Sequence, residues 1–294
     1  MGDSYRICNK LSVEQGLEKG LLGGPFQSKL TLKNGVSVSI NQFGKRTIEL
    51  STHTPTSWDD LFTTFQRIEK LLMLLDGRFY PIEKLRFFMD GDELTDVSIE
   101  YEQKRLGYFS SKDFCRYSWL RLMPFQNVLT DELIGKWNVL LDELDIAFQS
   151  LLYSLSDNRM PVDLNFAFLV ELAEPFTELL KEQTCYCQSL TPGERGTTLK
   201  MCVDTLIVIF GKAIFGEELS GDYASFLNLV VGSRVRIMHI KKKQNKFFDG
   251  KDCVKYSMKF SLLYRKILFE LLGINSGEYD EALQKATKII NKWE

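Results

Sequence analysis

Hydrophobic and polar residues alternate along the first part of the chain. Between Lys29 and Ile40 almost every second residue is apolar, and the alternation returns at residues 47–50. This period of two predicts half-buried strands, and the Asn34-Gly35 pair in the middle predicts the turn of a hairpin. Further short strands are predicted at residues 85–89, 97–101 and 117–122, with a turn at residues 90–93 after the first of them.

One helix is predicted inside this β-rich part. Ser57 is a suitable N-cap residue, and Asp60 stands at the position of a capping box. The apolar residues that follow recur at helical spacing: Leu61, Phe65, Ile68, Leu72 and Leu75. Residues 1–127 are therefore predicted to form a mainly antiparallel, β-rich domain with one helix across it.

After Pro124 the apolar residues recur with a helical period almost to the end of the chain. We expect a bridging helix within residues 128–158, and then a bundle of helices over residues 159–294. Pro175 is expected to kink one helix, and Gly273 to end another. The individual helices are predicted at residues 131–156, 164–179, 199–214, 226–243, 260–271 and 278–292. The predicted fold class is α+β, a β-rich N-terminal domain followed by an all-α bundle.

Composition and charge narrow the classes of function. The net charge of −2 excludes a polycation that coats nucleic acid, so any contact with nucleic acid must come from a local basic patch. No apolar run has the length of a membrane span and the N-terminus lacks a secretory signal, so we expect a cytoplasmic protein without membrane contact. The six cysteines are scattered, with no metal-binding spacing, so we expect neither a metal nor another cofactor.

The candidate chemistry lies in residues 231–243. Arg234 and His239 stand five residues apart in a helical pattern that ends in the basic run Lys241–Lys243. A histidine exchanges protons near neutral pH, and an arginine binds a phosphate through its planar set of donors. Together they are sufficient to cleave RNA without a metal, because the 2'-hydroxyl of the substrate is the nucleophile. The other histidine, His53, is predicted to lie in a loop.

The phase of this helix separates the two residues. Five positions advance an ideal helix by about 140°, so Arg234 and His239 meet on one phosphate only if the helix bends or if two copies of it face each other. Arg234 falls on an apolar line, and its charge needs a carboxylate there, from Glu171 or Glu174. Arg236, His239 and Lys243 follow a second line. The residues of the apolar line are Leu227, Val231, Arg234 and Met238.

The helical part resembles the HEPN superfamily (higher eukaryotes and prokaryotes nucleotide-binding), specifically its Apea-like group. Three segments carry the resemblance. Residues 168–176 are similar to the first helix of the family, with Glu174 at the place of a glutamate common there. Residues 226–239 are similar to the motif helix, and residues 262–274 to the closing helix. The β-rich part, with Trp137 in the bridging helix, resembles the N-terminal domain that accompanies this group.

The resemblance implies a metal-independent endoribonuclease of anti-phage defence, acting by abortive infection. It implies a homodimer in which two Arg-x4-His motifs form one site, with a phage-derived trigger or partner protein. His239 and Arg234 would be catalytic, and Glu174 would orient Arg234. The residues that would bind flanking phosphates of the RNA are Arg236, Lys241, Lys242 and Lys243.

Three other interpretations remain open from the sequence. The position after the arginine is usually polar in the family, often asparagine, whereas this chain has Val235. This departure favours a catalytically weak or inactive HEPN protein that binds RNA, a nucleotide or a partner protein as a regulator. A purely structural dimeric scaffold would explain the apolar helices but not the basic run. Short motifs also occur by chance, in which case Arg234 would neutralise a buried glutamate and His239 would be a surface residue.

Overall fold

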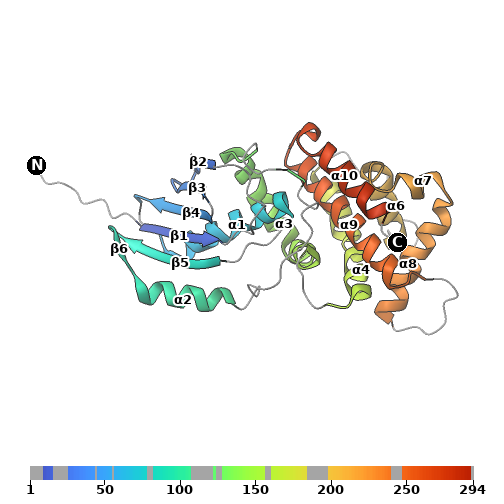
Figure 1. The fold of residues 1–294 in the computed structure, drawn as a ribbon, viewed down its shortest axis with the longest axis horizontal. Helices are drawn as coiled ribbons and strands as arrows, with labels where there is room; N and C mark the ends of the chain where they lie inside the picture. Colours follow the sequence, from blue (N-terminus) through green and yellow to red (C-terminus); the bar gives the residue numbers. More distant parts are fainter. Residues whose placement is uncertain are drawn as a thin grey trace, which may run out of the picture. The chain divides into compact units, whose positions relative to one another are not determined.

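The chain folds into two compact units, Met1–Asn138 and Val139–Glu294, in a computed structural model. The first contains the sheet and the second is helical, as the α+β fold class requires (Figure 1). Within the described part of the chain, no helix is both long enough and apolar enough to cross a membrane. The structure describes residues 9–15, 26–43, 45–54, 56–77, 82–106, 122–123, 128–155, 160–183, 198–239 and 247–292.

The first unit contains a six-stranded antiparallel sheet in the order β2-β3-β4-β1-β5-β6. The predicted hairpin is confirmed, because β2 and β3 pair around a turn in which Gly35 has φ 82°. A side chain is disfavoured at this positive φ, which explains the glycine. The strands are β1 (Asn9–Gln15), β2 (Phe26–Thr31), β3 (Ser37–Phe43), β4 (Lys45–Thr52), β5 (Ile82–Met89) and β6 (Asp92–Glu93).

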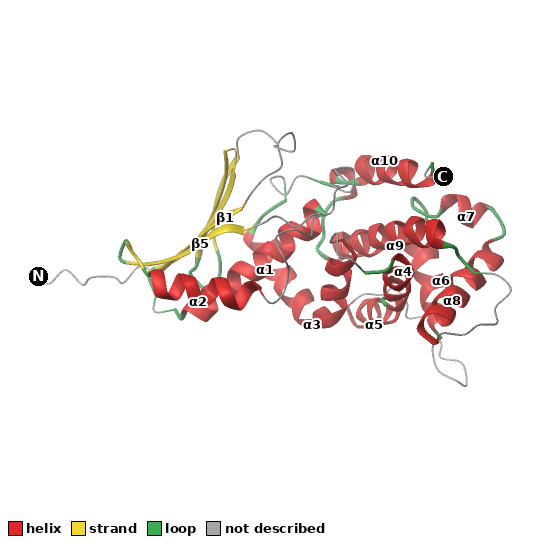
Figure 2. Ribbon diagram, turned by 60° about the horizontal axis from the view of Figure 1, so that its bottom comes forward, coloured by secondary structure: helices red, strands yellow, loops and turns green. Residues whose placement is uncertain are grey.

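Helix α1 (Trp58–Asp76) and helix α2 (Thr95–Leu106) lie on the same side of the sheet (Figure 2). The predicted start of α1 is confirmed, since the Ser57 hydroxyl accepts a hydrogen bond from the Asp60 amide. The side of the sheet that faces α1 is apolar: Leu11, Val13, Val38, Ile40, Ile48, Leu50, Leu85 and Phe87 are all buried. The sheet and its helices therefore form two layers around one core.

The strand predicted at residues 97–101 is wrong, because these residues belong to α2. Val97, Ile99 and Tyr101 alternate with polar residues, which imitates a strand. In the structure Tyr101 is buried and Ile99 is exposed, so the two do not share an inner face. Ser98 fixes the helix to the sheet, since its hydroxyl accepts a hydrogen bond from the amide of Phe87. The strand predicted at residues 117–122 lies outside the described residues except for Leu122, which is in no strand.

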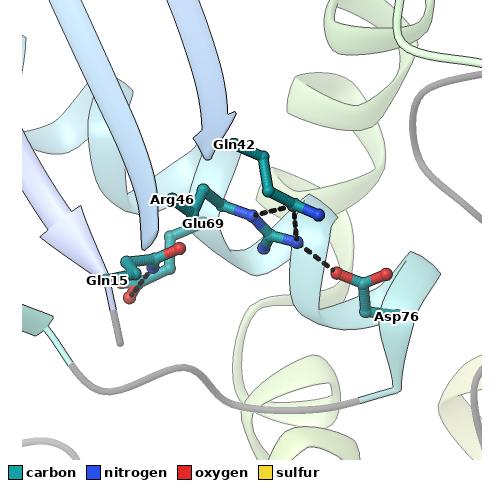
Figure 3. Close-up of polar contacts among 5 residues, drawn as sticks. All are labelled: Gln15, Gln42, Arg46, Glu69 and Asp76. Carbon is teal, nitrogen blue, oxygen red and sulfur yellow. Dashed lines mark hydrogen bonds and ion pairs between the residues drawn. The ribbon is translucent and has the colours of Figure 1, made fainter. Parts of the chain in front are cut away.

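A buried polar cluster joins the sheet to the C-terminal half of α1 (Figure 3). The guanidinium of Arg46 on β4 donates to Asp76 at the end of α1, over 3.0 Å, and to Gln42 on β3. Nearby, Gln15 on β1 donates to Glu69 on α1. The Arg46 and Asp76 side chains are 2% and 0% exposed. An ion pair this deeply buried fixes which part of the helix lies against which strand.

The second unit is built around α9 (Gly250–Leu271), which packs against α4, α6 and α10. Its Tyr264 is fully buried and donates to the carbonyl of Leu169 on α4. The long helix α3 (Asp131–Leu155) contains the division between the two units, and Trp137 on it donates to the Arg67 carbonyl of α1. The other helices are α4 (Val162–Glu171), α5 (Ala173–Gln183), α6 (Leu199–Phe210), α7 (Gly216–Ser220), α8 (Tyr223–His239) and α10 (Asp280–Asn291).

The helix predicted over residues 164–179 is present and is interrupted before Pro175, at Leu172, which keeps right-handed helical backbone angles (φ −60°, ψ −14°). The α-helix ends after Glu171, and α5 begins at Ala173 with Pro175 in its first turn, where no backbone donor is needed. Helix α9 begins at Gly250 with Asp249 as N-cap, ten residues earlier than predicted. Its predicted end is confirmed by Gly273, which has φ 74°. The predicted domain limits at residues 127 and 158 stay a prediction.

Candidate functional site

The candidate site lies on α8, which is a continuous α-helix from Tyr223 to His239. Its inner side is formed by Phe226, Leu227, Val230 and Ser233, which are buried. The opposite side of the helix faces outward, and we call it the outer ridge. Most of its residues are small or apolar, apart from Asn228 and the terminal histidine. The ridge consists of Ala224, Asn228, Val231, Gly232, Val235 and His239. Arg234 and Arg236 lie on the two flanks, between the buried side and this ridge.

Arg234 forms an ion pair with Glu171, the last residue of α4. The two side chains are 19% and 27% exposed, so the pair lies at the edge of the helix–helix contact. Partial burial lowers the pKa of Arg234, although an arginine remains charged at any physiological pH. Among the described residues, Nε of Arg234 has no hydrogen-bond partner. This Nε is buried, so the unpaired donor costs about 1–3 kcal/mol.

Glu174, expected to orient Arg234, is placed differently. It lies exposed in the first turn of α5, after the break at Leu172. The orienting carboxylate in the structure is Glu171, the other residue that the sequence offered for this role. Glu174 lies three residues further along the chain, beyond the interruption at Leu172.

His239 is the last residue of α8 and is exposed. Since the helix continues without interruption through both residues, Arg234 and His239 project about 140° apart around its axis. The two side chains of one chain therefore point to different sides of α8. The other histidine, His53, lies exposed in a bend after β4, which confirms the predicted loop position.

Arg236 lies on the His239 side of α8, since residues three apart on a helix are neighbours. Its guanidinium carbon stands 3.3 Å from the ring centroid of Phe247, a residue to which the sequence reasoning gave no role. The chain returns to α8 at this point, and the amide of Phe248 donates to the hydroxyl of Ser233 over 2.8 Å. The predicted phosphate-binding residues Lys241, Lys242 and Lys243 lie outside the described residues.

The helical unit also contains a buried ion pair, which was not predicted from the sequence. Lys259 on α9 and Glu218 on α7 form an ion pair of 2.6 Å, with side chains 0% and 7% exposed. Burial lowers the pKa of Lys259, and burial with the nearby Glu218 raises that of Tyr256. Lys259 also lies over the rings of Phe215 and Tyr256. Enclosed by aromatic rings, this pair fastens the short helix α7 to α9.

Other reactive groups are not gathered into a site. In the part of the chain that the structure describes, no three histidine, cysteine, aspartate or glutamate residues are arranged to hold a metal ion. The two described cysteines, Cys202 and Cys253, are free and buried. Burial raises the pKa of the Cys253 thiol to about 12, so this thiol is protonated and unreactive at neutral pH.

No protein-family model, no curated protein and no solved structure matches this chain. The resemblance to the HEPN superfamily therefore rests on the three sequence segments described above and stays a prediction.

Proposed function

We propose that the protein is a metal-independent endoribonuclease of the Apea-like HEPN type, acting in the cytoplasm in anti-phage defence by abortive infection. The observation that carries the proposal is that Arg234 is held in one orientation and remains partly accessible. Glu171 holds it at the edge of a helix packing contact, where the Arg234 side chain keeps 19% of its surface exposed. The same helix ends in the exposed His239. A phosphate-binding group and a proton-transfer group thus lie on one rigid element.

The proposed reaction is transfer of the scissile phosphate to the neighbouring 2'-oxygen. The 2'-hydroxyl loses its proton as its oxygen bonds to phosphorus, and the bond to the 5'-oxygen breaks as that oxygen gains a proton. His239 mediates this proton transfer as general acid and base. Arg234 stabilises the negative charge that develops on the non-bridging oxygens. The products are a 2',3'-cyclic phosphate and a 5'-hydroxyl.

A two-fold homodimer reconciles this chemistry with the direction of the side chains. Arg234 and His239 of one chain point about 140° apart, so a second copy of α8 must complete the site. The outer ridge of α8 supports such packing, because Ala224, Val231, Gly232 and Val235 are small or apolar and partly exposed. Two such ridges can approach closely and form a self-complementary interface. Arg236 and Lys241–Lys243 would then bind flanking phosphates. A phage-derived molecule is the trigger in this proposal.

Cleavage of a uniformly labelled RNA in EDTA tests the proposal. We expect cleavage to persist and every new 3' end to carry a 2',3'-cyclic phosphate. DNA and 2'-O-methyl RNA of the same sequence should remain intact, because neither has the free nucleophile. Cleavage of DNA, or an absolute requirement for a divalent metal, would contradict the mechanism. Light scattering should give the mass of a dimer, and a monomer with or without RNA would contradict the assembly.

Val235 favours a second candidate function, that of a catalytically weak regulator that binds RNA, a nucleotide or a partner protein. The ion pair of Arg234 and the exposure of His239 are equally compatible with this alternative. The EDTA assay distinguishes the two, because a regulator binds RNA and leaves it uncut. Val235→Asn should raise the cleavage rate if the apolar residue limits a working site, and should produce no cleavage in a regulator.

A further inference from the structure

Phe248, just before α9, is anchored to α8. Its amide donates to Ser233, and its ring is 8% exposed. The ring packs against three other aromatic residues, Phe166, Phe226 and Tyr256. The next residue, Asp249, accepts a hydrogen bond from Asp252 as the N-cap of α9. The chain on the C-terminal side of Phe247 is therefore held firmly by contacts that do not involve the Phe247 ring.

Phe247 itself is 45% exposed, in contrast to its buried neighbour. Arg236 lies over its ring at 3.3 Å from the centroid, so one face of the ring is covered and the exposed area belongs to the rest of the ring. A stack of this kind contributes about 0.5–1 kcal/mol at an exposed site. The result is a flat aromatic surface held in a fixed orientation, because its backbone is anchored and one of its faces is supported.

Arg236, on which Phe247 stacks, stands next to the proposed catalytic histidine on the surface of α8. Arg236 and His239 are three residues apart on α8 and project to neighbouring directions. Arg234, two residues before Arg236, projects about 200° away, on the opposite flank. A nucleotide whose phosphate is at His239 would therefore bring an adjacent base towards Phe247.

We infer that Arg236 and Phe247 form a stacking platform for an unpaired base next to the scissile phosphate, so the substrate is single-stranded RNA. This inference rests on the proposed function and extends it. Proteins bind single-stranded RNA by stacking splayed bases on aromatic rings and arginine planes, which contributes about 1–3 kcal/mol per base. Bases in a duplex are stacked on each other and cannot use the platform. Arg236 supports Phe247 from one side and keeps the edge of its guanidinium for a phosphate.

The test uses the full-length protein and a short 2'-O-methyl oligonucleotide that carries 2-aminopurine at one position, moved along the strand in successive probes. Stacking on Phe247 should quench the fluorescence at one position. Phe247→Leu should abolish this quenching and weaken binding by about 5- to 150-fold, the equivalent of one lost base stack. Phe247→Trp should restore both. Phe43→Leu, which alters an exposed phenylalanine of the sheet unit, is the matched control and should behave as the wild type.

An abasic nucleotide at the quenched position gives the decisive comparison. It should weaken binding to the wild type and add nothing to the loss in Phe247→Leu, because both changes remove the same stack. Equal binding by Phe247→Leu and the wild type, a further full loss with the abasic strand, or no binding of RNA would overturn the inference. The probe cannot be cleaved, so binding is measured separately from catalysis. Quenching without cleavage of ordinary RNA would refute the proposed ribonuclease alone, and cleavage without quenching would refute the platform alone.

Discussion

Two arginine–carboxylate pairs, one in each unit, differ in how much water reaches them. Arg46 and Asp76 are almost completely buried between the sheet and α1, whereas Arg234 and Glu171 are 19% and 27% exposed at the edge of a helix contact. A fully buried pair has no surface left for a ligand and determines how two elements pack. A half-buried pair holds an arginine in one orientation and leaves part of it accessible. The degree of burial, more than the residue types, separates the structural pair from the candidate site.

Breaking the buried pair should give the largest effect on stability. Arg46→Met removes the guanidinium that donates to the buried carboxylate of Asp76, and we expect a loss of about 3–5 kcal/mol in the free energy of unfolding. Urea denaturation measures this loss. The double variant Arg46→Met with Asp76→Leu should recover most of it, because the buried carboxylate is removed together with the guanidinium. A single variant as stable as the wild type would contradict a structural role for the pair.

The pair Lys259–Glu218 tests whether an ion pair stabilises the fold because it is buried or because it lies in the sheet unit. It lies in the helical unit and is as buried as the pair in the sheet unit. Glu218→Gln should therefore destabilise the protein, but by less than about 3 kcal/mol, because a buried lysine can lose its proton and an arginine cannot. The measurement is urea denaturation at neutral pH. A variant with unchanged stability would show that burial alone does not predict the effect.

A second test is how the free energy of unfolding of Glu218→Gln depends on pH. Burial lowers the pKa of Lys259, so between that pKa and 10.5 the unfolded chain binds more protons than the folded chain. The contribution of Lys259 to the free energy of unfolding therefore rises with pH in this window. The rise should be larger in Glu218→Gln, and Lys259→Met should lack it. The difference between the wild type and Lys259→Met isolates this lysine, because both proteins keep Glu218, which also raises the pKa of Tyr256.

The half-exposed pair should show the opposite behaviour, with a small effect on stability and a large one on activity. Glu171→Gln should change the free energy of unfolding by about 1 kcal/mol or less, because a pair at the edge of a helix contact contributes less than a fully buried one. The cleavage rate should fall by about 10- to 100-fold, because Arg234 loses its fixed orientation. Glu174→Gln is the matched control, exposed on the next helix, and should leave both quantities unchanged. A larger loss of activity in Glu174→Gln would return the orienting role to that residue.

The smallest effect is expected at the basic run. Lys242→Ala removes one phosphate contact in the proposal, so it should weaken RNA binding and reduce the slope of log affinity against log salt by about 0.7. The chemical step, measured in single turnovers at saturating protein, should hardly change. An unchanged salt slope would remove Lys242 from the RNA-binding surface.

Local patterns were sufficient to predict much of the fold. The hairpin around Gly35, the cap at Ser57 and the end of α9 at Gly273 each depend on a few neighbouring residues. Strand β1 was missed because only Leu11 and Val13 are apolar within it, and its partners β4 and β5 lie far along the chain. The strand expected at residues 97–101 failed because tertiary contacts of Tyr101 overrode local alternation.

The candidate site was predictable only in part, because its contacts join distant segments. Arg234 and His239 were placed on one helix from spacing alone, and the need for a carboxylate near Arg234 followed from its apolar line. The choice of Glu171 over Glu174 depends on how α4 and α8 pack against each other, which the sequence does not indicate. The stack of Arg236 on Phe247 depends on how the chain returns to α8, which no periodicity indicates.

The most direct test of the central claim, that the chemistry belongs to the exposed end of α8, is the cleavage rate of His239→Ala in EDTA. His239 is exposed, so the variant should keep the unfolding midpoint and the dimer mass of the wild type. Its cleavage rate should fall by about 10²–10⁴-fold, the usual contribution of a general acid or base. Cleavage at the wild-type rate would contradict the account and leave an RNA-binding regulator as the better description.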